Sequence, residues 1–175
     1  MWFKYPLIIL AFFMSAILQS SFFPSLSILG NIPNLVFILF FIIIFFEGKN
    51  DYDLGFWSAI IAGFFLDNLI LSYFGVAIVS LLVIYFLEKL TMHFIKEQQS
   101  KTLIVFFASL FLISYIVFNF TVYVFSVLID FQFNFSFDSS TIYLLFYSLV
   151  IACFGFYIYK FFIKKYKDEK QLKLL

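Results

Sequence analysis

Arginine is absent from this 175-residue sequence, and cysteine and histidine occur once each. With Cys153 alone, neither a disulfide framework nor a thiolate metal cluster can be built. Charged residues make up only 12% of the chain and the formal net charge is +1. No basic face for nucleic acid is expected from that composition. His93 has no catalytic partner near it, so we expect a solvated loop residue.

Apolar residues dominate instead. They form 65% of the sequence, including 31 phenylalanines, and the mean hydropathy is +1.08. A soluble domain of this size could not hide so much apolar surface in one core, and the rest would be exposed as aggregating patches. The composition therefore predicts an integral membrane protein.

Long uncharged runs alternate with short polar segments, which predicts an all-α polytopic membrane protein with six transmembrane helices in a single domain. The predicted spans cover about 5–23, 32–47, 54–71, 75–88, 102–129 and 141–160, followed by a Lys-rich tail at 160–175. The first run is longer than the apolar region of a signal peptide, so we expect a retained helix. The run 35–46 has no polar side chain, and we expect it to be the most lipid-exposed span.

The lysines predict the orientation of these spans. With six spans and a cytoplasmic N-terminus, all 11 lysines fall on the cytoplasmic side, and both chain ends lie inside. The tail is expected to anchor the chain and to be attracted to anionic lipid. Residues 88–101 could form a short amphipathic interfacial helix.

The third predicted span carries a row of small residues. Gly55, Ala59, Gly63 and Asp67 recur every four residues and therefore lie on one side of a helix. Such a row allows a second helix to approach closely in lipid. Two interpretations of Asp67 stay open: a solvated cap near the outer interface, or a buried contact or ligand group at a helix junction.

A second row, formed by Tyr115, Asn119 and Tyr123, follows the same spacing in the fifth span. It fits ordinary hydrogen bonding between helices, or a face that meets a partner protein. No zinc motif, phosphate loop or nucleophile elbow is present, and an intramembrane aspartyl protease would need a second carboxylate beside Asp67. We therefore expect no enzyme activity, no cofactor and no metal.

Residues 5–90 contain LQSSFFPSLSILGNIPNL at 18–35, then Gly55, Gly63 and Asp67, and then Phe74-Gly75. In these features they resemble the family of the rod shape-determining protein MreD. The family typically begins its second span with Pro-Asp-Leu, followed by G-x7-G-x3-D and a later glycine. Here Pro33-Asn34-Leu35 carries Asn34 in place of the acidic residue, which weakens any role that requires charge there.

The resemblance implies a non-enzymatic, multi-pass subunit of the bacterial cell-elongation machinery in the cytoplasmic membrane. Such a subunit binds the bitopic protein MreC, and together they link MreB filaments to the RodA glycosyltransferase and its transpeptidase partner. The residues expected to form its helix-packing or partner-binding junction are Pro33, Asn34, Gly55, Ala59, Gly63, Asp67 and Gly75.

The main alternative is the substrate-binding membrane subunit of an energy-coupling-factor vitamin transporter, which is similar in size and number of spans. Asp67 and Asn119 would then line a pocket near the outer surface. Against this alternative, few polar groups converge, and no arginine is available to hold an anionic vitamin. A third interpretation is a small assembly factor of another membrane complex.

Overall fold

The computed structural model describes residues 4–27, 32–47, 52–70, 74–95, 103–130 and 139–172. These segments form six α-helices, α1 (Lys4–Ile17), α2 (Leu35–Phe45), α3 (Tyr52–Ile70), α4 (Val76–Ile95), α5 (Leu103–Asp130) and α6 (Ser139–Leu172). After α1 the chain continues through a π-helical turn η1 (Leu18–Phe22) and a 3-10 turn η2 (Phe23–Leu26). The prediction of an all-α protein is confirmed.

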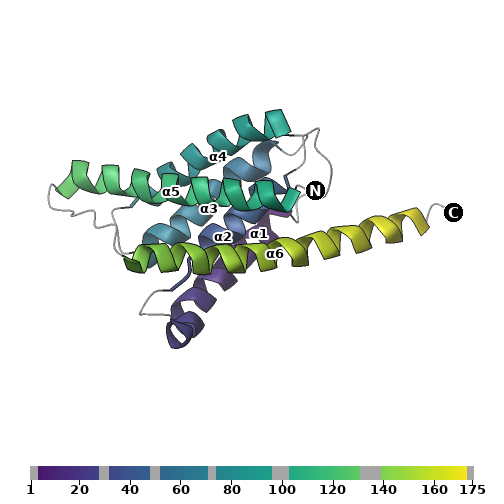
Figure 1. The fold of residues 1–175 in the computed structure, drawn as a ribbon, viewed down its shortest axis with the longest axis horizontal. Coiled ribbons are helices and arrows are strands. Elements are labelled where there is room, and N and C mark those ends of the chain that lie inside the picture. Colours follow the sequence, from purple (N-terminus) through teal and green to yellow (C-terminus); the bar gives the residue numbers. More distant parts are fainter. Residues whose placement is uncertain are drawn as a thin grey trace.

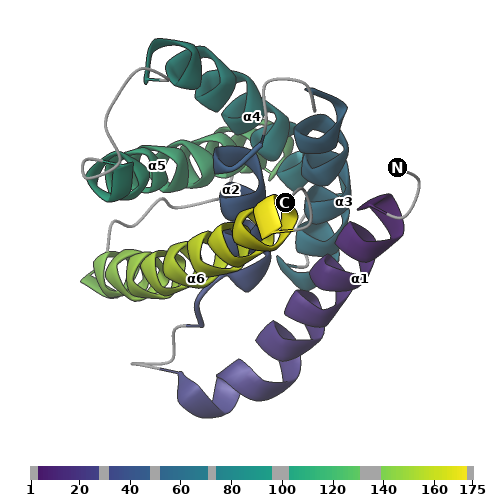
Figure 2. The same ribbon diagram turned by 90° about the vertical axis from the view of Figure 1, so that its right-hand side faces the viewer.

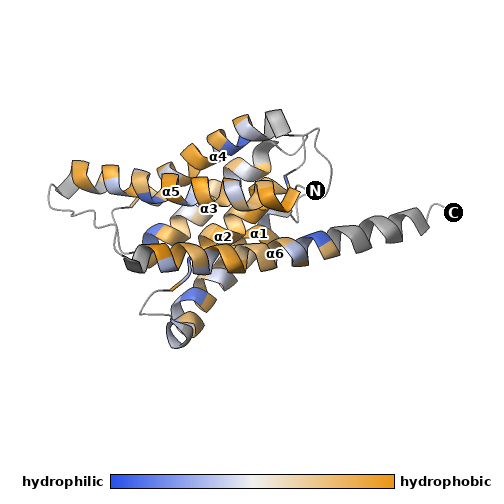
Figure 3. Ribbon diagram, viewed as in Figure 1, coloured by the Kyte–Doolittle hydropathy of each residue, from blue (hydrophilic) through white to orange (hydrophobic). Residues whose placement is uncertain are grey.

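Three of these helical segments are long and apolar enough to cross a membrane: Tyr5–Ser25, Leu103–Phe125 and Ile142–Phe161. Two further helices, Leu35–Phe45 and Leu54–Leu69, are apolar but shorter. Apolar residues cover most of the bundle (Figure 3). The helices indicate a membrane-embedded protein, as the composition predicts.

The central helix of the bundle is α2. In Figure 2 it lies in the middle, with the other five helices around it. Its backbone approaches those of α1, α3 and α6 closely. Seven of its 11 residues are buried: Val36, Phe37, Ile38, Phe40, Phe41, Ile42 and Ile44. The prediction that this is the most lipid-exposed span is therefore wrong, because a run without polar atoms suits a protein core as well as it suits lipid.

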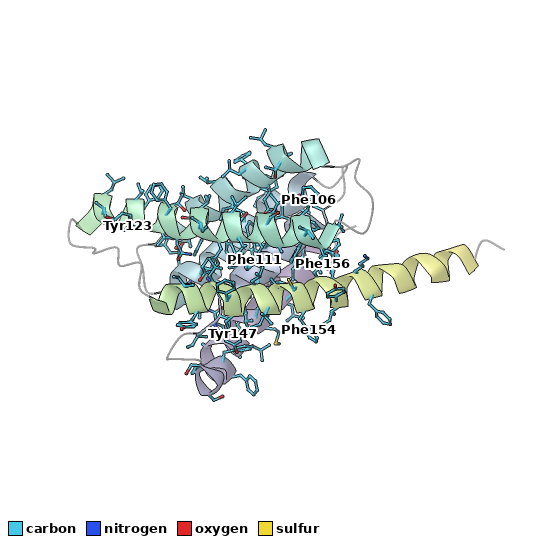
Figure 4. The ribbon with its side chains drawn as sticks, in the orientation of Figure 1. Phe106, Phe111, Tyr123, Tyr147, Phe154 and Phe156 are labelled. Carbon is cyan, nitrogen blue, oxygen red and sulfur yellow. The ribbon has the colours of Figure 1, made fainter. Side chains whose placement is uncertain are left out.

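Aromatic rings hold α2 against α5 and α6. The ring of Phe41 lies edge-on to Phe111, with 5.1 Å between centroids, and Phe45 meets Phe107 in the same way at 5.0 Å. Phe156 of α6 closes the cluster, 4.8 Å from Phe107. Edge-to-face pairs of this kind each add about 0.5–1.5 kcal/mol beyond their area burial. Figure 4 shows Phe111 and Phe156 where α5 and α6 meet the core.

Helices α3 and α4 form the most closely packed pair. Helix α4 runs without interruption to Ile95. The prediction of a short interfacial helix at 88–101 is therefore wrong for its first eight residues, because residues 88–95 continue α4. The remaining residues, 96–101, lie outside the described part, as does the side chain of His93.

The helix ends that the sequence assigns to the cytoplasmic side lie together. In Figure 1 the start of α1, the end of α4, the start of α5 and the end of α6 all lie toward the right-hand end of the bundle. Helix α6 extends well beyond the other helices there, as far as Leu172, so the start of the predicted Lys-rich tail is helical.

Candidate functional site

The row of small residues on α3 lies against α4. Gly55, Ala59, Gly63 and Asp67 are all buried. A Cβ atom added to Gly63 would lie 2.5 Å from the Cα and 2.8 Å from the backbone nitrogen of Ile78. The two helix backbones therefore touch at this point, which only a residue without a side chain allows.

The first turn of α3 is held by Glu47, which follows the end of α2. The Gly55 N–H donates to Glu47 Oε1 over 2.6 Å. A Cβ on Gly55 would meet Glu47 Oε2 and the Tyr85 ring, both at 2.5 Å. Glu47 thus supplies a carboxylate at a helix N-terminus, where unpaired N–H groups and the helix dipole favour negative charge. In the sequence, Glu47 stands at the end of the predicted span 32–47, and nothing in the pattern indicates this contact.

The other end of the row is occupied by Asp67. Its side chain is only 4% exposed. Oδ2 accepts from the Gly75 N–H and Oδ1 from the Ala77 N–H, both over 2.8 Å. Asp67, near the end of α3, therefore caps the beginning of α4. The structure combines parts of both sequence interpretations, because the carboxylate is a cap and it is buried at a helix junction.

Gly75 completes this junction through its backbone. Its φ angle is +101°, a conformation that residues with a side chain rarely adopt. Nothing lies within 4 Å of the position a Cβ would take, so conformation and not space selects glycine here. The turn places the first N–H groups of α4 directly on Asp67.

Asn34 caps α2 by the same principle. Its Oδ1 accepts from the Phe37 N–H over 3.0 Å, and Gln19 Oε1 from η1 accepts from the Val36 N–H over 3.4 Å. Pro33 is buried just before the cap, and α2 begins at Leu35. Amide and carboxylate caps are about equally good, so Asn34 needs no charge to cap α2.

The second candidate row, on α5, points largely into the protein. Tyr115 is 4% exposed and packs edge-on against Phe37, with 5.6 Å between ring centroids. The Asn119 side-chain amide donates to the Tyr115 carbonyl of its own helix over 2.8 Å. Tyr123 is half-buried. A partner face that includes Tyr115 is therefore wrong, because this tyrosine belongs to the core.

Glu88 of α4 is a buried carboxylate that sequence reasoning assigned to the end of a span. It is 1% exposed and accepts a hydrogen bond from Ser114 Oγ of α5 over 3.1 Å. No signal in the sequence marks it, since its burial depends on how α4 and α5 are offset. Within the described residues, no group of three or more His, Cys, Asp and Glu side chains could hold a metal ion.

Large apolar side chains are exposed on the outward surface of α1, α3, α4, α5 and α6. Phe154 and Phe156 show the two sides of α6, since the first is 67% exposed and the second 1% (Figure 4). Other strongly exposed residues are Leu7, Leu10, Ile113, Phe120 and Val150. This surface suits contact with lipid or with helices of another protein.

Comparison of the chain with protein-family models, curated proteins and solved structures finds no match. Functional inference therefore starts from the residues themselves. They divide into an internal junction between α3 and α4, held by Glu47 and Asp67, and an apolar outer surface.

Proposed function

We propose that this chain is a non-catalytic scaffold or regulatory subunit of the bacterial cell-elongation machinery, a six-span protein of the cytoplasmic membrane similar to MreD. It would bind an MreC-like bitopic protein. Through that partner it would connect MreB filaments with RodA and its transpeptidase, and so contribute to cell shape.

The observation that carries the proposal is that the residues behind the resemblance all lie along one contact between helices. Gly55 lies against the Tyr85 ring, and Gly63 lies against the backbone of Ile78. Asp67 accepts from the Gly75 N–H, and Gly75 has a φ angle that favours glycine, so all four serve the packing of α3 on α4. A motif with this structural purpose fits a protein that presents a rigid helical surface to other proteins.

The internal use of the junction moves the expected partner contact to the outside of the bundle. Since Gly63 is already packed against Ile78, a partner helix would have to use the exposed apolar surface, to which α1, α3, α4, α5 and α6 all contribute. In lipid such contacts depend on close packing and hydrogen bonds, because lipid is as apolar as the side chains. Partner binding is therefore best probed at exposed positions and not at Gly63.

The test is co-purification from membranes, with this chain tagged and co-expressed with the MreC-like protein and RodA of the same genome. A stable complex is expected. A photo-crosslinking residue placed at Leu10, Ile113 or Phe154, which lie on three different helices and are 55%, 58% and 67% exposed, should then capture the MreC-like protein from at least one position. The positions that face lipid serve as matched controls.

Failure of an intact MreC-like protein and RodA to co-purify would contradict the proposal. The vitamin-transporter alternative makes the opposite prediction, namely that the purified chain alone binds a vitamin tightly. A clear thermal shift with one vitamin, lost in an Asp67→Asn variant, would favour that alternative.

A further inference from the structure

The carboxyl group of Glu88 lies where α4 packs on α5. The residue is 1% exposed, so water does not reach it from the bundle surface. Oε1 accepts from Ser114 Oγ over 3.1 Å. Oε2 has no hydrogen-bond partner among the described residues. One oxygen of a buried acid is therefore left unpaired, which is costly and calls for an explanation.

The Ser114 contact also shows how deep Glu88 lies. Ser114 is the middle residue of the 23-residue apolar segment Leu103–Phe125, about 16 Å from either end. Helix α4 continues for about two turns past Glu88, to Ile95. The Glu88 carboxyl thus contacts the middle residue of the longest membrane-capable segment.

The charged and titratable groups around Glu88 leave it without a cation. On its own helix, Lys89 Nζ donates to Tyr85 Oη over 3.2 Å and lies over the Tyr85 ring. On α5 the neighbouring titratable group is Tyr115, which faces Phe37. From α2, Glu47 contacts the first turn of α3. In the described part of the chain, the side chain that hydrogen-bonds to the Glu88 carboxyl is the neutral Ser114.

An ionised carboxylate at this position would destabilise the folded protein far more than a neutral carboxylic acid would. Transfer of an isolated charge from water to an apolar interior is far more unfavourable than transfer of a neutral polar group without a partner. An ionisable residue at membrane depth is rare and is commonly functional. Binding of a proton would remove the charge.

We infer that Glu88 is an intramembrane proton-binding site, held as a neutral carboxylic acid at the α4–α5 contact. Since Ser114 donates to Oε1, the proton is carried by Oε2. This goes beyond the scaffold role, which uses only helix packing. Proton binding by Glu88 and the packing of α4 against α5 are then linked, because each favours the other.

The test uses the full chain in detergent micelles at neutral pH with dicyclohexylcarbodiimide, an apolar reagent for protonated carboxyl groups. The acid O–H adds across one C=N bond, with oxygen bonding to carbon and the proton passing to nitrogen. The acyl group then migrates to nitrogen as a stable N-acylurea. Mass spectrometry of the digest should place one such adduct on Glu88. Glu88→Gln, which has the same shape, should lose it, and Ser114→Ala should keep it.

A water-soluble carbodiimide provides the matched control and should label Glu88 several-fold less. Labelling by the water-soluble reagent alone would place the carboxyl in water and overturn the inference. Infrared spectroscopy gives a second measurement that needs no variant. The wild-type chain with ¹³C-labelled glutamate should show an isotope-shifted band of a protonated carboxylic acid. Absence of that band together with absence of the adduct would likewise refute the proton site.

Discussion

Helices α3 and α4 approach each other closely at Gly63, and Gly63→Ala tests this contact. A Cβ at this position would lie 2.5 Å from Ile78 Cα, whereas ordinary contacts lie at 3.4–4 Å. Two of the three nearest atoms, Cα and N of Ile78, belong to a helix backbone, which cannot rotate away as a side chain does. Helices α3 and α4 must therefore separate by roughly 1 Å, which loosens the contacts on either side.

The expected cost follows from two opposing terms. Forcing an extra methyl group into a packed interior costs about 1–3 kcal/mol. Replacing glycine by alanine in a helix stabilises the helix by about 1 kcal/mol, because alanine has the higher helix propensity. A net destabilisation of about 0–2 kcal/mol follows for Gly63→Ala, and the gain in propensity could mask most of the effect.

Gly155→Ala on α6 is the control that removes this ambiguity. Its Cβ would meet only Ile42 Cδ1, at 2.6 Å, the far end of a flexible side chain. Both variants gain the same helix propensity, so Gly63→Ala should be less stable than Gly155→Ala by about 1–3 kcal/mol. Unfolding by SDS in mixed micelles, followed by circular dichroism, measures the difference. Equal midpoints, or a more stable Gly63→Ala, would show that α3 and α4 do not touch here.

The same unfolding assay tests two predictions about helix caps. Asp67→Ala leaves the buried N–H groups of Gly75 and Ala77 without their acceptor and should cost about 2–4 kcal/mol, while Asp67→Asn, which keeps one acceptor oxygen, should cost less. Asn34→Asp should be neutral to within about 0.5 kcal/mol, whereas Asn34→Ala should cost about 1 kcal/mol, because the cap needs an acceptor and not a charge. An unchanged stability in either alanine variant would rule out the corresponding cap.

The row from Gly55 to Asp67 could be found from sequence, because small residues four apart stand out among large apolar ones. The sequence does not show which helix packs against this row. The same row fits a helix of another protein as well as α4, and only the fold shows that Ile78 and Tyr85 already fill it. The caps by Glu47 and Asp67 also join residues eight to ten apart across turns whose geometry the sequence does not fix.

Sequence determined the helical class and the membrane character, because long uncharged runs have few other solutions. Which face of each helix meets protein was decided only by the tertiary structure. In water, polarity separates inside from outside, but here Phe41 in the core and Phe154 on the surface are the same residue type. The central place of α2 and the depth of Glu88 follow from helix offsets and packing, which an apolar pattern does not record.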